Sequence, residues 1–115
     1  MEIDISGRHT FEVSEMLRAY TLEKMTKLDK YSLKMESAHV VFHAEKINET
    51  CEIVLLGKNL RISAKETTRN MQASLDAAVH KLQKQLERYH DRIKDKRAPR
   101  AGELVEEHEI ESEED

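Results

Sequence analysis

Residues 71–93 read MQASLDAAVHKLQKQLERYHDRI, and they carry the strongest structural signal in the chain. Its apolar residues recur every three or four positions, with no Pro or Gly between them. They are Met71, Leu75, Ala78, Leu82, Leu86, Tyr89 and Ile93. This spacing is typical of an α-helix that buries one face against a core. Pro99 and Gly102 predict that the helix ends shortly after this stretch.

Three strands are predicted upstream of this helix, because apolar residues alternate with polar ones. The alternating residues are Val40, Phe42 and Ala44, then Cys51, Ile53 and Leu55, then Leu60, Ile62 and Ala64. Residues 46–49 are the expected first connection, and 57–59 supply a tight turn that tolerates positive φ. A polar loop at 66–70 then offers Thr68 or Asn70 as the helix N-cap.

A further strand and helix are predicted at the N-terminus. Residues 2–6 alternate polar and apolar, and residues 7–10 turn the chain. Ser14 is a good N-cap, and the helix is expected to run to about Tyr31. Its apolar face is formed by Leu17, Tyr20, Thr21, Met25 and Leu28.

The predicted order is therefore βαβββα, an α+β fold in a single domain of residues 1–98. A four-stranded sheet carries two helices on one face and leaves its other face open to solvent. The chain of 115 residues is long enough for one such domain and too short for two. Residues 99–115 form a predicted disordered acidic tail, because they carry much like charge and little apolar surface.

Charge is segregated along the chain. Residues 101–115 contain eight acidic residues and no Lys or Arg, whereas residues 1–100 contain 19 basic and 15 acidic residues. The overall net charge of −4 thus conceals a domain with a net charge of +4. Residues 79–100 alone hold eight basic and three acidic residues, which indicates an anionic partner.

Two basic rows are candidate RNA-binding surfaces. One comprises Lys24, Lys27 and Lys30 on the first helix, and the other Lys81, Lys84, Arg88 and Arg92 on the second. Neighbouring helices with parallel basic rows suit a groove of nucleic-acid phosphates. The alternative is an ordinary solvated face with ion pairs such as Glu23 with Lys27. Aromatic residues make up only 4% of the chain, so base stacking would contribute little to any RNA binding.

Other chemistries find little support. Cys51 reads as a small buried apolar residue. His39 and His43 lie about 13 Å apart along one strand, too far to share an ion. The loop after the first strand offers only Gly7, whereas a phosphate cradle needs several glycines. We therefore expect no catalytic residues, no metal and no cofactor in a cytoplasmic protein without membrane spans.

The sequence resembles the bacterial ribosome hibernation promoting factors and ribosome-associated inhibitors, in their short form, over residues 1 to about 97. The order and spacing of several short segments carry this resemblance. They are Ile3-Asp4-Ile5-Ser6-Gly7, Leu17-Arg18, Lys24-Met25-Thr26-Lys27-Leu28-Asp29-Lys30-Tyr31, Val40-Val41, Glu45-Lys46, Asn70-Met71, Ala73, Leu75-Asp76 and Lys81-Leu82-Gln83-Lys84-Gln85-Leu86.

The resemblance implies a fold similar to double-stranded-RNA-binding domains. It also implies binding to ribosomal RNA of the small ribosomal subunit, alone and in intact ribosomes, in the channel for messenger and transfer RNA. Translation would then be inhibited sterically under stress or in stationary phase, by a protein that is monomeric when isolated. Lys24, Lys27, Lys30, Lys81, Lys84 and Arg88 match basic positions of the family.

Two features depart from the family pattern. Gln72 stands where an aromatic Tyr is usual. The acidic tail resembles the inhibitor branch, whereas the shortest promoting factors end just after the second helix. Three other readings remain open: a general RNA-binding or RNA-chaperone module, a protein-interaction module that docks through its tail, and an acylphosphatase-like enzyme.

Overall fold

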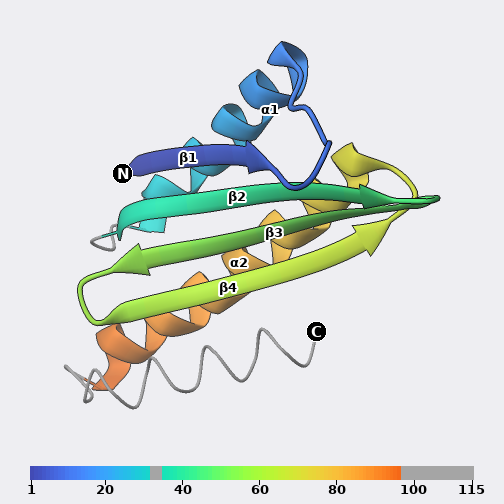
Figure 1. Ribbon diagram of the computed structural model, residues 1–115. Coiled ribbons are helices and arrows are strands. Elements are labelled where there is room, and N and C mark those ends of the chain that lie inside the picture. Colours follow the sequence, from blue (N-terminus) through green and yellow to red (C-terminus); the bar gives the residue numbers. More distant parts are fainter. Residues whose placement is uncertain (32–34, 97–115) are drawn as a thin grey trace.

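The computed structural model of the protein describes residues 1–31 and 35–96, with side chains described as far as Asp91. Its elements follow the predicted βαβββα order (Figure 1). They are β1 (Glu2–Gly7), α1 (Glu15–Thr26), the 3-10 helix η1 (Lys27–Tyr31), β2 (Met35–Glu45), β3 (Asn48–Gly57), β4 (Leu60–Thr68) and α2 (Met71–Lys96). The acidic tail expected at 99–115 and the end of the domain expected at 98 both lie outside the described residues.

The four strands lie in the sheet in chain order, β1-β2-β3-β4. β1 runs parallel to β2, and the other two pairs are antiparallel. Val40 sits between Ile5 and Ile53, so one row of apolar side chains crosses three strands. Parallel neighbours need a crossover connection, and α1 provides it.

Both hairpin connections are two residues long. Lys46 and Ile47 join β2 to β3, and Lys58 and Asn59 join β3 to β4. The first connection is shorter than the predicted 46–49, because β3 already begins at Asn48. Lys46 and Asn59 have φ of 58° and 61°, as tight hairpin turns require.

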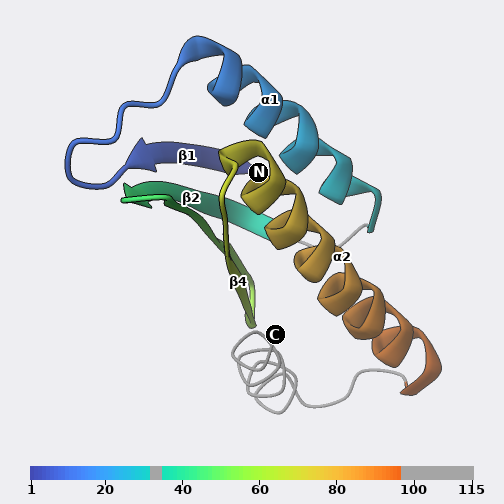
Figure 2. The same ribbon diagram turned by 90° about the vertical axis from the view of Figure 1, so that its right-hand side faces the viewer.

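Both helices cover the same face of the sheet, as predicted (Figure 2). The core is formed by residues that alternate along the strands and by the apolar stripe of α2. Its fully buried members include Val40, Phe42, Cys51, Ile53, Leu55, Ile62, Leu75, Leu82 and Leu86. Burial raises the pKa of Cys51 to about 12, with Glu52 adding to the effect, so this thiol is a packing group rather than a nucleophile.

The helix starts follow from side-chain caps. Ser14 Oγ accepts a hydrogen bond from the Leu17 amide at 3.1 Å. Asn70 Oδ1 accepts one from the Ala73 amide at 3.0 Å, so Asn70 rather than Thr68 caps α2. The first helix reaches Tyr31 as predicted, but its last five residues tighten into η1, which buries Leu28 and Tyr31.

Candidate nucleic-acid interface

α1 and η1 contact α2 along a polar seam. The Tyr20 hydroxyl donates a hydrogen bond to Asp76 Oδ1 at 2.7 Å, and Lys24 Nζ lies 3.4 Å from the same oxygen. At the other end, the Tyr31 hydroxyl donates to Glu87 Oε2 at 3.2 Å. These contacts join residues more than 50 positions apart, so they fix how the two helices present their outer surfaces.

Both tyrosines act as donors in this seam. The hydrogen bond to the Asp76 carboxylate raises the pKa of Tyr20, with burial adding to it. Burial raises the pKa of Tyr31, and the hydrogen bond to Glu87 adds to that shift. Both phenols therefore stay protonated at neutral pH, and each supplies a hydrogen bond to a carboxylate.

The first basic row divides into one partnered lysine and two exposed ones. The side chain of Lys24 is 27% exposed, and its ammonium pairs with Asp76 and lies 5.7 Å from the Tyr20 ring centroid. Lys27 and Lys30 are exposed, and Lys30 Nζ lies 5.3 Å from the Tyr31 ring centroid. Phosphate would thus meet Lys27 and Lys30 more readily than Lys24.

The cations of the second basic row differ in exposure. Lys81 forms an ion pair with Glu66 of β4, and its side chain is only 15% exposed. Lys84 and Arg88 are exposed. Lys84 lies two residues, or about 200° of helix turn, from both Leu82 and Leu86, so it points away from the sheet. The side chain of Arg92 lies outside the described residues.

The exposed cations named above define the basic helix face: Lys27, Lys30, Lys84 and Arg88. Much of the predicted positive charge lies further along the chain. Residues 92–100 contain five basic residues and one acidic residue. Within the described part, the basic helix face provides separated cations on a surface fixed by the seam, an arrangement that can contact several phosphates along a nucleic-acid backbone.

The structure also shows a feature that the helical periodicity did not predict, a polar pocket on the open face of the sheet. Among residues 1–31 and 35–91, no three His, Cys, Asp or Glu side chains group in a way that could hold a metal ion. No helix in the described part of the chain is long and apolar enough to cross a membrane.

Comparison with known proteins finds that the chain is similar to proteins named ribosome hibernation promoting factor. The chain is 31% identical over 94 residues to the ribosome hibernation promoting factor of Salmonella typhimurium, covering 82% of this chain and 98% of that protein. It is 30% identical over 94 residues to that of Escherichia coli strain K12, with the same coverage. The Pseudomonas putida factor is 30% identical over 92 residues, covering 80% of this chain and 89% of that one.

Solved structures share the fold. The Protein Y N-terminal domain of Thermus thermophilus superposes with a TM-score of 0.70 at 27% identity, covering 77% of this chain and 99% of that one. A ribosomal subunit interface protein of Coxiella burnetii superposes with a TM-score of 0.69 at 23% identity, covering 77% of this chain and 97% of that one. A family profile described as sigma 54 modulation protein / S30EA ribosomal protein matches residues 3–94. This match spans β2, β3 and β4, all of β1 except Glu2, and most of α2, and the chain belongs to that family.

Proposed function

We propose that this protein is a ribosome hibernation factor that binds the small ribosomal subunit and inhibits translation under stress or in stationary phase. The observation that carries the proposal is similarity along nearly the whole folded part. The chain covers 98% of relatives named ribosome hibernation promoting factor at about 30% identity. The fold, shared with the solved ribosomal subunit interface protein of Coxiella burnetii, presents the basic helix face in one rigid unit.

The mechanism we propose is steric and makes or breaks no bond. The domain occupies the channel where messenger and transfer RNA sit, as a monomer in the cytoplasm, and excludes them. Lys27, Lys30, Lys84 and Arg88 contact ribosomal-RNA phosphates directly. Lys24 and Lys81 are held by carboxylates in the free protein, so they contribute mainly by shaping the surface. Arg92 is proposed to extend the same face.

Recognition by charge and shape fits the composition of the surface. Phe and Tyr together number five and Trp is absent, so stacking on aromatic rings contributes little. Folded RNA is read largely through its backbone and shape, which requires a rigid pattern of cations. The seam that joins α1 and η1 to α2 supplies that rigidity, because two tyrosines and a lysine contact carboxylates of α2.

Co-sedimentation with ribosomes through sucrose gradients, at low and moderate salt, tests the proposal. We expect stoichiometric migration with the small subunit and with intact ribosomes but not with the large subunit. Excess transfer RNA bound at the small subunit is expected to displace the protein. Protein that stays at the top of the gradient in both salts would refute the proposed function.

A general RNA-binding or RNA-chaperone module is the second candidate. The observation in its favour is that the basic helix face offers lysines and an arginine but no base-reading aromatic side chain. Equal, salt-sensitive binding to ribosomes and to unrelated structured RNA would support this candidate over the first.

A further inference from the structure

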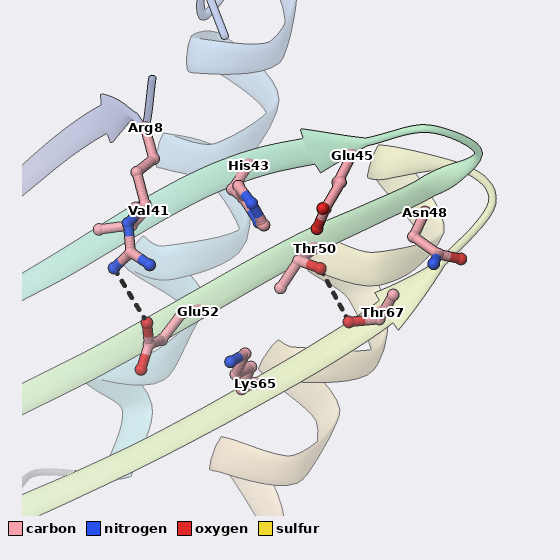
Figure 3. Close-up of a pocket in the computed structure, with 9 residues that line it drawn as sticks. All are labelled: Arg8, Val41, His43, Glu45, Asn48, Thr50, Glu52, Lys65 and Thr67. Carbon is pink, nitrogen blue, oxygen red and sulfur yellow. Dashed lines mark hydrogen bonds and ion pairs between the residues drawn. The ribbon is translucent and has the colours of Figure 1, made fainter. Parts of the chain in front are cut away.

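The open face of the sheet, opposite the helices, carries a pocket of about 240 Å³ near the β2–β3 hairpin (Figure 3). Strand register brings its residues together: Thr50 pairs with His43 and Thr67, and Glu52 pairs with Lys65. Arg8, from the loop after β1, reaches over Val41 toward Glu52. Three strands and a loop thus supply the lining of one concave site.

The charges in this pocket balance. The Arg8 guanidinium lies 3.7 Å from the Glu52 carboxylate, and Lys65 is the cross-strand neighbour of Glu52. Glu45 lies at the edge of the pocket. The two cations, Arg8 and Lys65, and the two carboxylates, Glu45 and Glu52, give no formal excess of charge. The pocket therefore lacks the positive charge that would attract phosphate by itself, in contrast to the basic helix face.

The polar groups of the pocket suit a nucleobase instead. The Thr50 and Thr67 hydroxyls lie 2.8 Å apart in a hydrogen bond, and Thr50 is only 9% exposed. Carboxylates such as Glu52 accept hydrogen bonds from exocyclic amino groups of bases. Planar guanidinium and imidazole groups, here Arg8 and His43, stack on unpaired bases. The His43 ring is braced by His9, whose ring centroid is 5.8 Å away.

We propose that this pocket binds one unpaired RNA base that carries an exocyclic amino group, so cytosine, adenine or guanine is accepted and uracil is not. The volume lies below the roughly 300–1,000 Å³ of pockets for drug-sized ligands, which favours a single base over a stacked run. RNA as the partner rests on the proposed function. The inference adds a second contact surface: phosphates position the domain through the basic helix face, and the sheet reads one base.

Short oligonucleotides test this site. Amide chemical shifts are followed by NMR during titration with hexacytidylate, hexauridylate and cytidine monophosphate at moderate salt. We expect hexacytidylate to shift His43, Thr50 and Glu52 together with Lys84, whereas hexauridylate shifts only the basic helix face. Hexacytidylate is expected to bind about fivefold tighter than hexauridylate, the order of one base-specific hydrogen-bonded contact. Equal affinities would overturn the proposal, and so would pocket shifts of equal strength with the mononucleotide, which would assign the site to free nucleotides.

Charge reversal separates base reading from simple electrostatics. Glu52→Lys adds positive charge, so nonspecific phosphate binding would tighten for both oligonucleotides. If Glu52 reads the base, the same variant loses a hydrogen-bond acceptor and no longer prefers hexacytidylate to hexauridylate, which is the result we expect. Glu2→Lys, an exposed residue at the start of β1, makes the same charge change and is expected to keep the preference. Arg8→Ala, a loop substitution outside the strands, is a second variant expected to reduce the preference. A preference that survives both pocket variants would overturn the assignment.

Ribosome binding is measured in parallel, so that the two proposals fail separately. Absence of co-sedimentation with retained cytosine preference would refute the proposed function and support the pocket. Intact co-sedimentation with no response of the pocket residues would support the proposed function and overturn the pocket assignment.

Discussion

Neutralising two cations of the basic helix face is expected to weaken ribosome binding in a way that salt reveals. The double variant Lys84→Gln/Arg88→Gln removes charges that are exposed on α2, outside the core. Each phosphate contact contributes about 0.7–0.9 to the slope of log K against log salt concentration. Loss of two contacts therefore lowers that slope by about 1.4–1.8. If variant and parent bind equally at 1 M salt, the variant therefore binds roughly 25- to 60-fold more weakly than the parent at 0.1 M salt.

The assay is equilibrium binding of labelled protein to purified small subunits over a range of salt concentrations. The matched control is Lys46→Gln/Lys58→Gln, which removes two exposed lysines from the hairpin turns. This control is expected to change the slope little. Thermal unfolding of both double variants is expected to stay close to that of the parent protein, because surface substitutions usually alter stability by about 0.5 kcal/mol or less. An unchanged slope for Lys84→Gln/Arg88→Gln would refute the assignment of these residues to phosphate contacts.

Three further predictions address the energetics of the fold. Leu86→Ala removes a side chain with no exposed surface and is expected to lower the free energy of unfolding by about 2–5 kcal/mol in denaturant titrations. The same change at Leu22, which is 40% exposed, is expected to cost far less. Equal costs would place Leu86 outside the core. Lys81→Ala is expected to cost about 1–3 kcal/mol in stability, because it leaves the Glu66 carboxylate without its partner. It is also expected to weaken ribosome binding less than Lys84→Ala does. The opposite ranking in melting and binding assays would contradict the roles given to the two lysines. Burial raises the pKa of Cys51 to about 12, so its contribution to stability is complete below the unfolded pKa near 8.5 and is lost as pH rises toward 12. Between pH 8 and pH 10 the parent is expected to lose roughly 1–2 kcal/mol more than Cys51→Ala, and parallel pH profiles would show that the thiol is solvated.

The fold was predictable because its signals are local. The four-residue step from Leu82 to Leu86 indicates a helix whatever it packs against, and alternation through Val40 and Phe42 indicates a strand. Ser14 likewise caps its helix through a contact only three residues long. The confirmed order βαβββα follows from these patterns alone.

The candidate site was only partly predictable, because spacing along a helix does not reveal what lies opposite. Lys81 shares a row with Lys84 by spacing, yet it pairs with Glu66, whose position depends on how β4 packs under α2. Lys24 meets Asp76 across 52 residues of sequence. The open-face pocket depends on strand register and on the path of the loop that carries Arg8, neither of which periodicity determines.

The parallel pairing of β1 with β2 has a consequence for how the chain folds as it is synthesised. Glu2 pairs with Ser37, so the first strand waits for 35 further residues before its partner exists. At roughly 5–20 residues per second, that delay is about 2–7 s. The elements β2, β3, β4 and α2, by contrast, join neighbours in sequence through short turns and can assemble as they emerge. The β1 segment therefore stays unpaired during this interval, with Ile3 and Ile5 still uncovered and accessible to chaperones.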